Sequence, residues 1–209
     1  MRRAFVFDQE KCMGCNACSV ACKDNNDVNP GPVRWRHQQT YEPQSGGFFP
    51  FSMSCAHCED PACLKACGSR AIIKRPDGIV YIDRARCTDL RTCLDACPFA
   101  AAYIADDQQE PHSLSGWRVR HPMQKCDFCK DRQDRGERPI CVSSCPCFAL
   151  DAGDYDEMIA KYKSFGIDLV PLTPSEFPYA YKNNTDDTNP SILVNKRGPQ
   201  TIIKAIDNY

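Results

Sequence analysis

The sequence predicts an α+β chain built around cysteine-rich units, with inserted hairpins and an extended C-terminal arm. Three observations support this class. Cysteines recur in four tight groups, short apolar runs of strand length stand beside these groups, and the residues after Gly166 are rich in Pro, Asn, Thr and Asp without a helical period. At 209 residues the chain is long enough to bury a core in one large or two small domains.

Short strands and helices are expected through the first half of the chain. Residues 4–7 are a short buried strand that leads into the first cysteine group, and residues 17–25 are a short helix that follows it. Residues 30–50, which contain Trp35 and Tyr41, are expected to form an inserted loop or hairpin.

The second half is expected to hold a hairpin, a helix and an arm. The stretch "IIKRPDGIVYI" predicts a β-hairpin, because Pro-Asp-Gly is a turn sequence and apolar residues alternate in both flanks. A final helix is expected from Asp154 onward. Residues 168–209 lack the apolar period to fold alone, so we expect them to be an arm that gains order by lying across a partner.

Composition excludes several classes of protein. The formal net charge of −1 gives no reason to expect nucleic acid as a partner, and no apolar run approaches the length of a membrane span. The start, "MRRAFVF", is not followed by an apolar stretch and a cleavage site, so we expect no signal peptide. Sixteen cysteines suit a secreted disulfide scaffold, but such scaffolds are shorter and lack repeated C-x2-C clusters.

Fifteen of the sixteen cysteines fall into four sequence groups, and Cys147 is left over. Groups one, two and four have four members each, whereas group three has three. The groups are Cys12, Cys15, Cys18 and Cys22; Cys55, Cys58, Cys63 and Cys67; Cys87, Cys93 and Cys97; and Cys126, Cys129, Cys141 and Cys145.

The spacing of these groups predicts iron-sulfur clusters. In the run C-x2-C-x2-C-x3-C-P, the first three cysteines bind one cluster and the fourth binds another. Zinc is the rival, because groups two and four each contain a C-x2-C knuckle. We favour iron because the longer motif recurs. A zinc-stabilised scaffold without a redox role stays open as the alternative from a different class.

The four groups in this order, with "SCAHCEDPAC", "RPDGIVYID" and "RPICVSSCP", resemble one known family. The chain is similar over residues 3–152 to the four-cluster electron-transfer subunits of the molybdopterin (complex iron-sulfur) oxidoreductases, most closely the dimethyl sulfoxide reductase type. The resemblance implies two tandem, interleaved bacterial two-cluster ferredoxin units of the βαβ type. Residues 1–27 and 112–152 form the first, 55–111 the second, 28–54 the inserted loop or hairpin, and 153–209 the C-terminal helix and partner-binding arm.

The resemblance also implies which cysteines share a cluster, because the family pairs group one with group four and group two with group three. Three 4Fe-4S clusters and one 3Fe-4S cluster are expected. The 4Fe-4S ligands are Cys12, Cys15, Cys18 and Cys145; Cys22, Cys126, Cys129 and Cys141; and Cys55, Cys58, Cys63 and Cys97, while Cys67, Cys87 and Cys93 remain around the fourth cluster.

Group three lacks one ligand. In "CTDLRTCLDACP" the second ligand position is Leu90, whose hydrocarbon side chain cannot bind iron. Three thiolates match a 3Fe-4S cluster, a cubane that lacks one iron. Two alternatives stay open: the site is empty with Leu90 filling core, or Asp89 completes a 4Fe-4S cluster.

Other residues have plainer explanations. Cys147 is expected to be a buried inert thiol, and His57 to contact the ligand loops without binding metal. Residues 130–138, "KDRQDRGER", mix charges as on a solvated face, with a docking surface as the alternative. Trp35 and Trp117 are expected to fill core or interface.

No Ser/His/Asp set, P-loop or dinucleotide fingerprint is present, so we expect no catalytic site in the chain. The resemblance implies one-electron transfer between a molybdenum or tungsten cofactor in a large catalytic subunit and a quinone-linked membrane subunit or soluble donor. The alternative is the small subunit of a formate dehydrogenase or hydrogenase system, or an independent polyferredoxin. The chain is expected in the cytoplasm or at the membrane, or exported with its catalytic partner.

Overall fold

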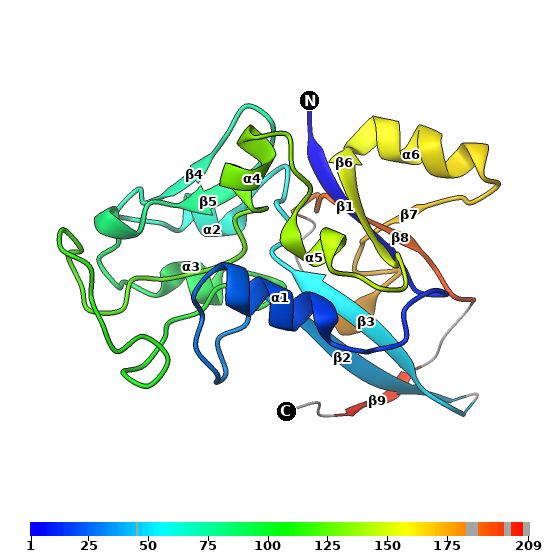
Figure 1. Ribbon diagram of the computed structural model, residues 1–209, viewed down its shortest axis with the longest axis horizontal. Helices are drawn as coiled ribbons and strands as arrows, with labels where there is room; N and C mark the ends of the chain where they lie inside the picture. Colours follow the sequence, from blue (N-terminus) through cyan, green and yellow to red (C-terminus); the bar gives the residue numbers. More distant parts are fainter. Residues whose placement is uncertain (45, 183–187, 199–201, 207–209) are drawn as a thin grey trace.

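In the described part of the chain, three small sheets and several short helices form a fold that is α+β, as predicted (Figure 1). The computed structural model describes residues 1–44, 46–182 and 188–198, and the backbone of residues 202–206. The strands β4 (Ile72–Lys74) and β5 (Val80–Ile82) with the helices α2 (Ala62–Lys65) and α3 (Thr92–Asp95) lie toward one end of the molecule, and α6 (Tyr155–Ser164) lies toward the other (Figure 1). The division into two interleaved units stays a prediction.

The central sheet joins the beginning and the end of the chain. Its strand order is β6-β1-β8-β7, with β1 (Arg3–Asp8) and β6 (Leu150–Asp154) antiparallel. The strand β8 (Ile192–Asn195) pairs with β1 in parallel, and β7 (Val170–Pro171) pairs with β8 antiparallel. The expected strand is therefore confirmed as β1, whose apolar run fits a strand buried on both faces.

The first and last cysteine groups meet through two helices. The helix α1 (Ala17–Asn25) has the predicted bounds, and it packs against α5 (Ile140–Ser143). Because α1 carries Cys22 and α5 carries Cys141, this packing brings the two groups together.

The inserted segment is a hairpin, which confirms one of the two expected forms. Its strands are β2 (Arg36–Pro43) and β3 (Phe49–Ser54), and β9 (Ile202–Ile206) pairs with the outer edge of β2. All six residues of β3 are buried, so this strand covers the central sheet and leads directly into Cys55.

Groups two and three lie on short helices around the second predicted hairpin. Its strands are β4 (Ile72–Lys74) and β5 (Val80–Ile82), followed by the 3-10 helix η1 (Arg84–Arg86). The helices α2 (Ala62–Lys65) and α3 (Thr92–Asp95) pack together, and the Thr92 hydroxyl donates to the Ala66 carbonyl oxygen at 2.7 Å. The helix α4 (Lys130–Asp134) follows the first half of group four.

The expected final helix is confirmed as α6 (Tyr155–Ser164). The side chain of Asp154 accepts a hydrogen bond from the Asp156 backbone at 3.2 Å and caps its first turn.

The C-terminal segment corrects the expected arm. It supplies β7, the 3-10 helix η2 (Pro178–Ala180), β8 and β9, and it buries Leu172, Phe177 and Leu193 completely. These apolar residues join the core through strand pairing with distant parts of the chain, so a helical period is not needed. Residues 183–187, 199–201 and 207–209 of the expected arm lie outside the described residues. A role of the segment in partner binding stays a prediction.

Candidate metal centres

All sixteen cysteines are described, and each is a free thiol. Below, "set" denotes a group of thiols close in space, in contrast to the groups along the sequence. Set one is Cys12, Cys15, Cys18 and Cys145; set two is Cys22, Cys126, Cys129 and Cys141; set three is Cys55, Cys58, Cys63 and Cys97; set four is Cys67, Cys87 and Cys93.

Set one lines a surface pocket between β1 and the loop after α5. All four thiols border this pocket, and Cys15 is exposed. Burial, together with Cys18, Cys145 and Cys15, raises the pKa of Cys12 to about 11. Four thiols from opposite ends of a long sequence interval therefore meet here.

Set two is the most deeply buried. All four of its cysteines are buried. Burial raises the pKa of Cys22 to about 12, and Cys141 and Cys129 raise it as well. Burial and neighbouring thiolates both disfavour the negatively charged form of each cysteine in this set. A positively charged occupant would stabilise that form.

Set three is closed over by the C-terminal segment. Burial and the thiolates of Cys55, Cys63 and Cys97 raise the pKa of Cys58. The hydroxyl of Thr188 donates to the Cys58 sulfur at 3.0 Å, and this contact is buried. The segment after α6 thus takes part directly in a thiol site.

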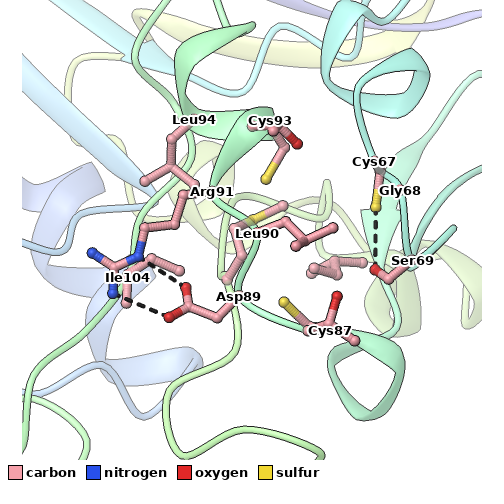
Figure 2. A pocket seen from close by; sticks show the side chains of 14 residues that line it. Cys67, Gly68, Ser69, Cys87, Asp89, Leu90, Arg91, Cys93, Leu94 and Ile104 are labelled. Carbon is pink, nitrogen blue, oxygen red and sulfur yellow. Dashed lines mark hydrogen bonds and ion pairs between the residues drawn. The ribbon is translucent and has the colours of Figure 1, made fainter.

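Set four lines a pocket that also contains Leu90 (Figure 2). Burial, Cys67 and Cys87 raise the pKa of Cys93 to about 11. Leu90 lies among the three cysteines and is 60% exposed, so it does not fill the core. This corrects the interpretation of Leu90 as a core residue.

The carboxylate of Asp89 is already engaged. The guanidinium of Arg91 donates to both of its oxygens at 3.1 Å, as Figure 2 shows. A bidentate pair of this kind holds the carboxylate toward Arg91. Whether Asp89 is a fourth ligand of set four stays a prediction to be tested.

The four sets follow one another in a row. Burial raises the pKa of Cys141, and Cys18 of set one raises it further. In the same way, Cys55 of set three acts on Cys126 of set two, and Cys93 of set four acts on Cys63 of set three. Electrostatic influence therefore connects set one to two, two to three, and three to four.

Cys145 and Cys147 differ in their local geometry. The sulfurs of Cys67, Cys97 and Cys145 each accept a hydrogen bond from the backbone N–H four residues later, at 3.3, 3.4 and 3.3 Å. Cys145 thus repeats the geometry of two other predicted ligands, and its own role as a ligand stays a prediction. Cys147 is only partly buried and borders the pocket of set one, which corrects the expectation of a buried thiol.

His57 is a buried packing residue. Its Nδ1 accepts a hydrogen bond from the Val80 backbone at 3.0 Å, and its ring meets Phe128 edge to face. Burial, Lys125 and Arg36 lower its pKa, so the ring is neutral at neutral pH. It joins the β4–β5 hairpin to the loop of set three, and the expectation that it does not bind metal stays a prediction.

The remaining predicted residues have ordinary surroundings. The Trp35 indole donates to Gln124 at 2.8 Å, and the Arg84 guanidinium lies 4.2 Å from the centre of the Trp117 ring. Residues 130–138 form ion pairs at the surface, including Arg135 with Glu137 at 2.7 Å.

Three further residues were not predicted from the sequence. Arg36 and Lys125 are buried cations beside the thiols, and Thr188 bonds to Cys58. Proximity along the chain gives a signal only for Lys125, which precedes Cys126. The other two reach their thiols through long-range packing.

Two features are absent from the described part of the molecule. There, no three Cys, His, Asp or Glu side chains converge as ligands of a single metal ion. In a cluster each thiolate binds its own iron, so a cluster does not need such convergence. Among the same residues, no helix has the length and apolarity that crossing a membrane requires.

The crowded, buried thiols fit iron-sulfur clusters, because the positive charge of bound iron stabilises the thiolate form of each ligand. Comparison with known proteins bears on this fit. A family profile described as "4Fe-4S dicluster domain" matches residues 47–155, and one described as "4Fe-4S binding domain" matches residues 5–25.

Curated relatives cover most of the sequence. It is 36% identical to the B subunit of the anaerobic dimethyl sulfoxide reductase of Escherichia coli (strain K12), over 88% of this protein and 92% of the relative. The protein belongs to the iron-sulfur electron-transfer subunits of the molybdopterin oxidoreductases.

Two more relatives extend this family. The protein is 37% identical to the thiosulfate reductase electron transfer subunit of Salmonella typhi, over 73% of its own length and 76% of the relative. It is 30% identical to the B subunit of the polysulfide reductase of Wolinella succinogenes, over 92% and 94%. Like other members of this family, it is an electron-transfer subunit without a catalytic site of its own.

Proposed function

We propose that the chain relays single electrons through four iron-sulfur clusters between a molybdenum or tungsten cofactor in a large catalytic subunit and a quinone-linked membrane subunit or a soluble donor. The observation that carries this proposal is the succession of the four thiol sets in space. Helix α1 carries Cys18 of set one and Cys22 of set two. Lys125, which precedes Cys126 of set two, donates to Cys55 of set three at 3.3 Å, and the helices α2 and α3, which carry cysteines of sets three and four, pack together. Electron transfer between clusters requires this kind of close succession.

Three 4Fe-4S clusters in sets one to three and one 3Fe-4S cluster in set four are the occupants we assign. Four thiols support a complete cubane in each of the first three sets. Set four offers three thiols, with Leu90 exposed beside them and Asp89 held by Arg91. A 3Fe-4S cluster is the form that three thiolates complete.

The protein's own residues hold and insulate these clusters. The clusters supply the one-electron chemistry, while the cysteines bind iron and the backbone N–H groups after Cys67, Cys97 and Cys145 donate to their sulfurs. The buried surroundings of set two exclude water. Hydrogen bonds and burial are the means by which a protein adjusts cluster potentials.

The ends of the row are the sites where electrons enter and leave. Sets one and four border pockets at the surface, where Cys15 and Leu90 are exposed. Sets two and three lie between them. The names of the relatives support sulfoxide, thiosulfate or polysulfide as the substrate class of the large subunit.

The test is anaerobic purification of the tagged chain from the cell that makes it. A large subunit that contains molybdenum or tungsten should co-purify. After reduction of the complex with dithionite, dimethyl sulfoxide, thiosulfate or polysulfide should restore the visible absorption of the oxidised clusters. The chain separated from the large subunit is the control and should remain reduced. A brown chain that purifies alone from its native cell would contradict the proposal.

A further inference from the structure

Two cations are buried inside the row of thiols. Arg36 and Lys125 are each only 2% exposed. In the part of the chain that the structure describes, neither forms an ion pair with a carboxylate; their hydrogen bonds go to hydroxyl, carbonyl and thiol groups. A buried cation without an anionic partner is costly, so each needs compensation from a nearby negative charge.

Arg36 lies at the junction of sets one and two. Its two terminal nitrogens donate to the hydroxyls of Ser52 and Ser54 at 3.1 and 2.9 Å. The Ser52 hydroxyl lies 3.6 Å from the sulfur of Cys18, which belongs to set one. Toward set two, the strand β2 that carries Arg36 packs against α1, which carries Cys22.

Lys125 lies at the junction of sets two and three. Its ammonium donates to the sulfur of Cys55 at 3.3 Å, which places the charge directly on set three. It also donates to the carbonyl oxygens of Cys126, at 2.7 Å, and of Val80, and these bonds hold it beside set two. Among the described residues, the Asp127 carboxylate forms its ion pair with Lys130, at 3.9 Å, and not with Lys125.

The negative charges that compensate these cations are therefore those of the thiolate-bound clusters. Each electron that enters a cluster adds one negative charge, and a fixed cation nearby stabilises that charge most strongly where water is excluded. Set two is adjacent to both cations, sets one and three to one cation each, and set four to neither.

We propose that Arg36 and Lys125 act on electron transfer through their positive charges. They raise the reduction potentials of the clusters on either side of them. Arg36 acts on sets one and two, and Lys125 acts on sets two and three. This inference rests on the proposed function, because it requires clusters in the thiol sets. It assigns to the chain a built-in pair of charges that keeps the buried middle of the relay reducible.

The test is a redox titration, monitored by electron paramagnetic resonance, of the purified complex with each cluster assigned by a Cys→Ser variant in its set. Lys125→Met removes the charge and keeps an unbranched side chain. We expect the ratio of reduced to oxidised cluster at a fixed solution potential to fall about tenfold in sets two and three, which is about 59 mV for a one-electron couple. Set one should stay unchanged.

Arg36→Gln should lower the same ratio in sets one and two and leave set three unchanged. Arg36→Lys keeps the charge and should restore most of the loss. Ser52→Asp leaves Arg36 in place but neutralises it, so it gives a second route to the same shift if Arg36→Gln does not bind iron. Lys163→Gln removes an exposed cation on α6 and is the control for net charge.

Full iron content with unmoved potentials in Lys125→Met and in the Arg36 and Ser52 variants would overturn this proposal and leave the proposed function intact. Equal shifts in all four clusters would also overturn it. Such shifts would indicate a general loosening of the fold, whereas the proposal predicts shifts only in the clusters next to each cation. Absence of clusters from the wild-type protein would overturn both proposals.

Discussion

Sets three and four lie next to each other around the same two short helices, α2 and α3. They differ in how far each set is closed to solvent. Set three has four thiols, a buried hydrogen bond from Thr188 and a direct contact with Lys125. Set four has three thiols in a surface pocket with Leu90, which is 60% exposed. The comparison shows that Leu90, at the predicted position of the missing ligand, lies where the site opens to the surface.

The thiols of the two sets also differ in their surroundings. Burial and neighbouring thiolates raise the pKa of Cys63 in set three to about 12. In set four, burial acts on Cys67 in the same direction, but hydrogen bonds from Ser69 and from the backbone outweigh it and lower the pKa of that thiol. Cys63 and Cys67 therefore differ in their surroundings: burial dominates at Cys63, and local hydrogen bonds dominate at Cys67.

The largest expected effect comes from removing the segment that closes set three. Truncation after Gly166 deletes β7 and β8 and the buried side chains of Leu172, Phe177 and Leu193. Each buried side chain of this size contributes about 2 kcal/mol, so the loss approaches the whole stability of a typical domain. We expect insoluble or cluster-free protein, measured as soluble yield and iron content.

The matched control for this truncation is a much shorter one. Removal of residues 207–209 alone, which follow the last strand β9, should leave both the soluble yield and the iron content unchanged. A soluble protein truncated after Gly166 that keeps its full iron content would show that the segment is an arm after all.

The second effect converts set four into a copy of set three. Leu90→Cys restores the second thiol of the motif, and because Leu90 is exposed the substitution should cost little stability. We expect a 3Fe-4S signal in oxidised wild-type protein and its replacement by a reducible 4Fe-4S cluster in the variant. Electron paramagnetic resonance and iron analysis measure both.

Leu90→Ala is the control, since it removes the side chain without adding a ligand and should keep the 3Fe-4S signal. Persistence of that signal in Leu90→Cys, with unchanged iron, would contradict the assignment of Leu90 to the missing ligand position.

A smaller effect separates the two sets by one hydrogen bond. Thr188→Val removes the donor to Cys58. If this hydrogen bond favours the reduced state by about 1 kcal/mol, its loss lowers the reduction potential by roughly 40 mV for a one-electron couple. We expect a lower potential in set three and no change in set four, by redox titration. Thr188→Ser keeps the hydroxyl and should behave as wild type; a shift of set four in Thr188→Val would argue for a general structural effect.

The smallest effect is expected at Asp89. Its carboxylate is paired with Arg91, so Asp89→Asn should leave the iron content and spectrum of set four unchanged. Loss of iron from this set alone would restore the carboxylate as a fourth ligand.

Local features of the fold and site could be predicted, and non-local ones could not. Cysteine spacing, the helix Ala17–Asn25 and the turn after Lys74 depend on neighbouring residues, so the sequence contains their signal. The parallel pairing of β8 with β1 depends on residues almost the whole chain apart. The same holds for the bond from Thr188 to Cys58, because no periodicity indicates which distant segments will meet.

The most direct measurement of the central claim is the metal and sulfide content of the wild-type protein, purified without oxygen. Three 4Fe-4S clusters and one 3Fe-4S cluster require about 15 iron atoms per chain, matching acid-labile sulfide, and little zinc. About 12 irons without a 3Fe-4S signal would contradict the occupancy of set four. Stoichiometric zinc with negligible sulfide would contradict the relay as a whole.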